Sequence, residues 1–123
     1  MPQDILSTAH ALADAARPIA LRYFRGSGQG LENKETTYFD PVTRADREIE
    51  AAMREILAAR RPDDAILGEE FGPKTGNSGL TWVLDPIDGT ASFGHQVPLW
   101  GTLVALRYDD NSVAGACELP ALD

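Results

Sequence analysis

The sequence predicts an α+β fold in which two N-terminal helices pack on a largely antiparallel sheet. Apolar residues recur at helical spacing in two segments of the first half of the chain. Four short apolar runs follow from residue 65 onward, and a polar turn separates the last two of them. There is no internal repeat or evident linker, and 123 residues suffice for one hydrophobic core. We therefore predict a single domain over residues 1–123.

The first predicted helix covers residues 3–25. Its apolar side chains lie within about 40° of one line along the helix, at about 100° per residue. They are Ile5, Ala9, Leu12, Ala16, Ile19 and Tyr23. Because Pro18 lacks a backbone N–H, we expect it to kink this helix or to split it after Ala16. The glycine-rich segment 26–30 should then end the helix in a flexible loop.

The second predicted helix begins near Thr43 and is stopped by the segment 60–62, Arg-Arg-Pro. Thr43 is a suitable N-cap because an acidic residue, Asp46, follows three positions later. One face of this helix is apolar. Its members are Ala45, Ile49, Ala52, Met53 and Ile56.

The second half of the chain predicts a sheet. The expected strands are residues 65–67, 81–84, 99–107 and 113–117, with residues 109–112 as the hairpin turn between the last two. We expect Trp82 and Trp100 in the core or at an interface. Cys117 has no partner for an internal disulfide and is expected to be buried in the last strand.

Composition excludes several classes of protein. With 43% hydrophobic and 24% charged residues, the chain is neither disordered nor fibrous. A net charge of −8 repels phosphate backbones, so we expect no nucleic-acid partner. We also expect no membrane partner, since there is no run of 18 apolar residues and the start does not read as a signal peptide. A single cysteine is compatible with a reducing compartment, which makes the cytoplasm the expected location.

Acidic residues cluster where two of the predicted strands end. Glu69 and Glu70 follow the strand 65–67, and Asp85 and Asp88 follow the strand 81–84. Four carboxylates in a partly dry site would repel one another unless cations lay between them. Hard oxygen ligands suit Mg²⁺, so the pattern predicts a magnesium site.

The segment 85–90, Asp-Pro-Ile-Asp-Gly-Thr, offers further chemistry. Asp85 can bridge two ions, and the Ile87 carbonyl can serve as a neutral ligand. Gly89 permits a positive φ, and a short helix starting at Thr90 would present free amides to a phosphate. The Thr90 hydroxyl, polarised by an acid such as Asp46, could orient an attacking water.

Each acidic motif also has an ordinary explanation when taken alone. Glu69 and Glu70 could form a solvated loop, Asp85 and Asp88 could be turn formers, and Asp46 could be a helix cap. Their combination favours function over these readings.

Two other phosphate or metal motifs fail on spacing. An EF-hand loop starting at Asp85 would need oxygen ligands where Ile87 and Gly89 stand, and a glutamate where Gln96 stands. A phosphatase with an aspartyl nucleophile has two acids one residue apart, whereas two residues separate Asp85 from Asp88.

These motifs resemble the N-terminal half of the inositol monophosphatase superfamily, whose members are metal-dependent phosphomonoesterases. The resemblance rests on VTRAD at 42–46, GEE at 68–70 and DPIDGT at 85–90, and it extends over essentially the whole chain. It implies a layered α/β sandwich whose second lobe, with a further metal-binding aspartate, is absent from these residues.

The resemblance also implies roles for individual residues. It implies two or three Mg²⁺ ions in a complete site, with the ligands Glu69, Asp85, the Ile87 carbonyl and Asp88. The implied catalytic residues are Thr90 and Asp46, which activate the water, together with Glu69. The implied phosphate-binding and substrate-binding residues are Gly89, Thr90 and Lys34.

The segments 88–93 and 97–106 are most similar to the histidinol-phosphatase branch. We therefore predict hydrolysis of a small phosphorylated metabolite, with histidinol phosphate favoured and inositol monophosphate next, by attack of a metal-activated water. Without the second lobe, the 123 residues alone are expected to be inactive and to form a homodimer or otherwise self-associate. Two alternatives remain open: a non-catalytic fragment that folds and associates with itself or a partner, and an acidic binding module without metal chemistry.

Overall fold

A computed structural model describes residues 3–24, 39–95, 97–98, 100–108 and 111–122. Two long helices, α1 (Gln3–Tyr23) and α2 (Phe39–Arg60), precede the strands β1 (Ala65–Gly68) and β2 (Leu80–Asp88). A short helix, α3 (Thr90–Gly94), leads to the hairpin of β3 (Gly101–Tyr108) and β4 (Asn111–Glu118). A 3₁₀ turn, η1 (Pro120–Leu122), follows β4. The predicted order of two helices before a sheet is confirmed.

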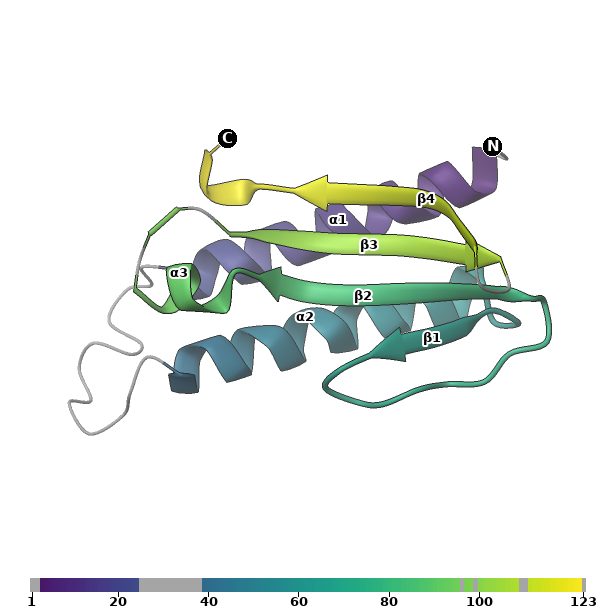
Figure 1. Ribbon diagram of the computed structural model, residues 1–123, viewed down its shortest axis with the longest axis horizontal. Helices are drawn as coiled ribbons and strands as arrows, with labels where there is room; N and C mark the ends of the chain where they lie inside the picture. Colours follow the sequence, from purple (N-terminus) through teal and green to yellow (C-terminus); the bar gives the residue numbers. More distant parts are fainter. Residues whose placement is uncertain (1–2, 25–38, 96, 99, 109–110, 123) are drawn as a thin grey trace.

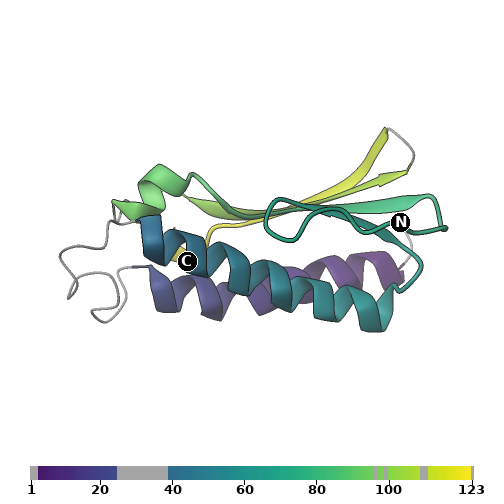
Figure 2. The same ribbon diagram turned by 90° about the horizontal axis from the view of Figure 1, so that it is seen from below.

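The four strands lie in the sheet in chain order, β1-β2-β3-β4 (Figure 1). β1 and β2 are parallel, whereas β2 pairs antiparallel with β3, and β3 antiparallel with β4. Figure 2 shows α1 and α2 side by side against one face of the sheet, with no element of the described residues on the other face. The largely antiparallel sheet under two helices is therefore confirmed as predicted.

The core lies between the helices and the covered sheet face. Leu12 of α1 and Met53 of α2 are fully buried there. Along β2, Trp82 and Leu84 are buried while Val83 and Asp85 are only half-buried, which is the alternation expected of a strand with one covered face. Trp100 is also buried, so of the two predicted places, core or interface, both tryptophans occupy the core.

Helix α1 continues through Pro18, so of the two predicted outcomes, a kink or a split after Ala16, the split is wrong. A proline removes one intrahelical hydrogen bond. Core contacts on both sides of it offset that loss, since Ala16 and Ala20 are both fully buried. The helix ends at Tyr23, and the predicted loop at 26–30 lies outside the described residues.

Helix α2 begins at Phe39, four residues before the predicted start, so Thr43 lies inside the helix rather than at its N-cap. Pro41 falls in the first turn, where a missing N–H costs nothing because those groups have no intrahelical acceptor. The predicted end at Arg60 is confirmed.

The strands occur where they were predicted, with different ends. β2 runs four residues beyond Leu84, to Asp88, and Asn111 and Ser112 belong to β4 rather than to a turn. The expectation that Cys117 is buried is wrong: its thiol is free and exposed. Cys117 pairs with Leu103 on the sheet face that the helices leave open, which explains the exposure.

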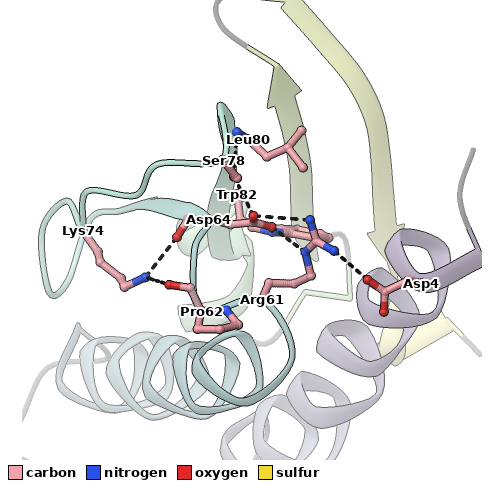
Figure 3. A network of polar contacts seen from close by, with 8 residues as sticks. All are labelled: Asp4, Arg61, Pro62, Asp64, Lys74, Ser78, Leu80 and Trp82. Carbon is pink, nitrogen blue, oxygen red and sulfur yellow. Dashed lines mark hydrogen bonds and ion pairs between the residues drawn. The ribbon is translucent and has the colours of Figure 1, made fainter.

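A polar network centred on Asp64, which lies between α2 and β1, joins the end of α2 to β2 (Figure 3). The buried carboxylate of Asp64 accepts hydrogen bonds from Arg61 Nε (2.7 Å), Ser78 Oγ (2.7 Å) and Trp82 Nε1 (2.8 Å). Arg61 also pairs with Asp4 of α1, at 2.6 Å. The network anchors both helices to the strand end opposite the acidic motifs.

Among the described residues, no helix is both long and apolar enough to cross a membrane.

Candidate active site

The two acidic motifs meet at one edge of the sheet because β1 and β2 are parallel and end side by side. Gly68, the last residue of β1, pairs with Leu84, so Glu69 emerges next to Asp85. Asp85 and Asp88 lie within β2 rather than after it, which corrects the prediction that the strand ends at Leu84. Glu69 and Asp88 are exposed, and Asp85 is half-buried.

A bulge in β2 turns Asp85 and Asp88 to the same side of the sheet. Asp85 pairs with Leu103 and Asp88 pairs with Gly101, so three steps along β2 correspond to two steps along β3. In a regular strand, residues three apart point to opposite faces. The extra residue restores the alternation, which brings both carboxylates to one face.

The bulge is held by Thr102, a residue that sequence reasoning did not single out. Its buried hydroxyl donates a 2.7 Å hydrogen bond to the Pro86 carbonyl. Pro86 lies where the pairing of β2 with β3 is interrupted, and this bond gives its carbonyl a hydrogen-bond donor. Thr102 lies in a segment that only suggested a family branch, and no spacing rule connects it to Pro86.

Asp46 reaches the same edge from α2. Its carboxylate is half-buried. Burial, together with the charges of Glu70, Asp85 and Glu69, raises the pKa of Asp46 to about 7, and the Ile87 N–H opposes part of that rise. Asp46 is therefore electrostatically coupled to both acidic motifs.

The pKa of Asp85 is also raised, first by burial and then by the charges of Asp88 and Glu69. These carboxylates thus lie close enough to destabilise one another when ionised. Among the described residues, no three His, Cys, Asp or Glu side chains are placed so that they could hold a metal ion. The oxygen donors are nevertheless of the type that a hard divalent cation prefers, and a bound cation would offset the repulsion that adds to burial in raising both pKa values.

The backbone beyond Asp88 adopts the predicted conformation. Gly89 has a φ of 89°, in the left-handed region, and α3 begins at the next residue. Thr90 is exposed at that start. The buried side chain of Phe93 anchors α3, and the centre of its ring lies 4.9 Å from that of Trp100 and 5.5 Å from that of Phe24. The structure thus places Gly89 and Thr90 beside the sheet edge that carries Asp46, Glu69, Asp85 and Asp88, which we call the acidic edge. Lys34 lies outside the described residues.

A second residue missed by sequence reasoning is Glu50, whose side chain is fully buried. Its carboxylate accepts hydrogen bonds from the backbone N–H groups of Glu70 and Phe71, both at 3.2 Å, and pairs with Arg54 at 3.0 Å. The available signal was an acid one helical turn after Asp46, beside the apolar face of α2.

Comparison with known proteins identifies relatives of the whole chain. The family model described as "Inositol monophosphatase family" matches residues 1–123. A histidinol-phosphatase from Chlorobaculum parvum is 42% identical over 118 residues, covering 95% of this chain and 44% of the relative. An inositol-1-monophosphatase from Mycobacterium leprae is 45% identical over 95 residues, covering 73% and 33%.

The fold has the same relatives. An inositol monophosphatase from Zymomonas mobilis superposes with a TM-score of 0.76 at 40% identity, covering 96% of this chain and 44% of the other. The chain therefore spans about half the length of the relatives that it matches.

Proposed function

The chain belongs to the inositol monophosphatase family, and from that premise we propose that it carries half of the active site of a Mg²⁺-dependent phosphomonoesterase. The observation that carries the proposal is the acidic edge, at which Asp46, Glu69, Asp85 and Asp88 gather from α2, β1 and β2. Burial, and then mutual repulsion at this edge, raises the pKa values of Asp46 and Asp85. Such a cluster destabilises the metal-free fold, and cation binding is the simplest function that compensates for it.

The cation ligands in this proposal are Glu69, Asp85, the Ile87 carbonyl and Asp88. Bound Mg²⁺ would neutralise charge on the phosphoryl group and lower the pKa of the attacking water. A second or third ion would need ligands from outside these residues, because the described edge offers each ion few carboxylates. That requirement agrees with a chain that spans half the length of its relatives.

Asp46 and Thr90 form the proposed water-activating pair. A carboxylate at Asp46 would accept the proton of the Thr90 hydroxyl, whose oxygen would then orient the attacking water. The amides of Gly89 and Thr90 would hold the phosphate, because no side-chain cap makes a hydrogen bond at the start of α3. Lys34 is proposed to contribute positive charge to the same phosphate.

Histidinol phosphate is the favoured substrate, and inositol monophosphate is the second choice. Support comes from the segments 88–93 and 97–106 and from the relatives named histidinol-phosphatase, which match nearly the whole chain. We further propose a cytoplasmic enzyme that forms a homodimer or otherwise self-associates, and that has no nucleic-acid or membrane partner.

A second candidate function is association without catalysis. It is favoured by an open apolar depression on the sheet face away from the helices, lined in part by Val83, Leu103, Ala105 and Cys117. A face of this kind calls for a covering partner, which could be another segment of a longer chain or a second copy.

Phosphate release discriminates between the two functions. We would measure it from histidinol phosphate and from inositol monophosphate, using a chain extended to about twice this length by downstream coding sequence, with Mg²⁺ and with EDTA. Mg²⁺-dependent release supports the enzyme. Absence of release from either substrate, in a folded protein that binds Mg²⁺, would favour association instead.

A further inference from the structure

We propose that Glu50 and Arg54 are positioning residues that hold the loop after β1, residues 69–72, and thereby set the cation affinity of the acidic edge. The inference rests on the proposed function, since it concerns the same edge. Neither residue belongs to the metal or phosphate ligands proposed above. Both lie on α2, one turn apart, beneath the backbone that carries Glu69.

Glu50 binds the loop through its backbone. One carboxylate oxygen accepts the N–H of Glu70, and the other accepts the N–H of Phe71. These two amides directly follow Glu69, while Gly68 directly precedes it inside β1. Glu69 is therefore held on both sides, by strand pairing before it and by a buried carboxylate after it.

Gly68 lets Glu50 approach this closely. A Cβ at position 68 would lie 2.4 Å from one Glu50 carboxylate oxygen and 2.7 Å from the other. Any larger residue would displace the carboxylate from the two amides. The glycine of the GEE motif thus has a physical role that follows from a residue 18 positions earlier.

Arg54, one helical turn after Glu50, contacts the same segment further along the chain. It pairs with Glu50 at 3.0 Å and donates a hydrogen bond to the Gly72 carbonyl. Its guanidinium lies 5.9 Å from the centre of the Phe71 ring. Glu50 therefore binds two backbone amides of the loop, while Arg54 binds the Gly72 carbonyl and lies over the Phe71 ring.

A buried ion pair is a poor device for stability alone, because apolar residues of similar volume often serve equally well. The loop itself is largely exposed at Glu69 and Phe71, so little apolar burial holds it in place. The pair instead supplies directional bonds where a ligand must be presented at a defined position. Residues that orient metal ligands in this way typically affect metal affinity by about 10- to 100-fold.

The first test compares Mg²⁺ affinity, measured by calorimetry on the 123-residue chain, between the parent and Glu50→Gln. We expect at least about tenfold weaker binding in the variant. The matched control is Asp64→Asn, which alters the other buried carboxylate–arginine pair, at the far end of β1. The control should be less stable but should bind Mg²⁺ within about twofold of the parent. Unchanged affinity in folded Glu50→Gln would overturn the inference.

A second variant guards against misfolding. The double substitution Glu50→Leu with Arg54→Met removes both charges and keeps an apolar volume, which folded proteins usually tolerate. It should also lose Mg²⁺ affinity, and hydrogen exchange at the amides of Glu70 and Phe71 should accelerate. Faster exchange with unchanged affinity would give the pair a purely structural role and overturn the inference.

Failure of the proposed function gives a different result. In that case the parent would bind no Mg²⁺ and the extended chain would release no phosphate, which would overturn both proposals. Normal Mg²⁺ binding by the parent and by every variant overturns only the positioning role.

Discussion

The backbone N–H of Ile87, inside the bulge of β2, lowers the pKa of the Asp46 carboxyl on α2. This interaction couples the helix to the segment that carries Asp85 and Asp88. It favours the ionised form of a carboxylate that burial and three neighbouring acids disfavour. Asp46 therefore combines a structural contact with an electrostatic cost.

The first prediction concerns that cost. Because the pKa of Asp46 is about 7 in the folded chain and lower when unfolded, the folded state binds the extra proton between about pH 4 and 7. Stability of the metal-free chain should fall as pH rises through this window. Asp46→Asn should remove the loss and raise the melting temperature at pH 8 in EDTA by about 5 °C. The exposed Asp14→Asn is the control, and an equal melting temperature for Asp46→Asn and the parent would contradict the prediction.

The second prediction concerns the proposed cation ligands. In the extended chain, Asp85→Asn or Glu69→Gln should remove most of the Mg²⁺-dependent phosphate release while leaving the circular dichroism spectrum unchanged. Neutralising one ligand weakens cation binding and the stabilisation of the phosphoryl transition state together. Full turnover of Asp85→Asn in EDTA would refute the assignment.

The third prediction separates the hydroxyl of Thr90 from its backbone amide. Thr90→Ala keeps the amide that is proposed to hold phosphate but removes the group that orients the water. In the extended chain, we expect this substitution to lower the kcat of phosphate release by about 10²-fold or more with little change in KM. The exposed Thr75→Ala serves as control. A change confined to KM would assign Thr90 to substrate binding.

The fourth prediction concerns the network of Asp64. Burial raises the pKa of this carboxyl, but hydrogen bonds from Arg61, Ser78 and Trp82 outweigh burial and hold it below the ordinary range. Its contribution is present above about pH 4 and is lost as pH falls through the lowered pKa. Asp64→Asn should cost about 3 kcal/mol at pH 7, measured by urea unfolding, because it leaves Arg61 without its buried partner.

The cost of Asp64→Asn should shrink in acid. A variant whose deficit is equally large at pH 2.5 and at pH 7 would show that the charge of Asp64 is not what stabilises the network.

The fifth prediction concerns the 123-residue chain by itself. It should fold and self-associate through the open sheet face, yet release little or no phosphate, because the ligands and the pocket wall expected from the rest of a longer protein are absent. Sedimentation and phosphate release, compared with the extended chain, check both parts. Equal kcat/KM for the two chains would mean that a neighbouring copy supplies the missing groups.

Much of this architecture could be predicted from periodicity and motif spacing. The alternation around Trp82 and the apolar stripe of α2 identify elements that bury one face, and the structure confirms them. Their ends were less predictable. Pro18 and Pro41 obey local rules, but core packing and position in the first turn decided what each one does to its helix.

The candidate site was predictable where chemistry is local in the sequence. The acids of GEE and DPIDGT, and the positive φ of Gly89, can be inferred from adjacent residues. Thr102 and Glu50 could not be found in this way, because each acts on backbone atoms that are 16 to 21 residues away. The exposure of Cys117 was also missed, since an apolar strand pattern does not reveal which sheet face lacks a cover.

The order of the strands in the sheet has a consequence for how the molecule assembles. Every strand pairs with its neighbour in the chain, so no pairing has to wait for a distant segment. Short loop closures are entropically cheap and favour rapid folding. During synthesis, α2, β1 and β2 can therefore collapse together as soon as β3 leaves the ribosome. The acidic edge would be built early, and its ionic environment in the cell could then influence folding before any substrate is met.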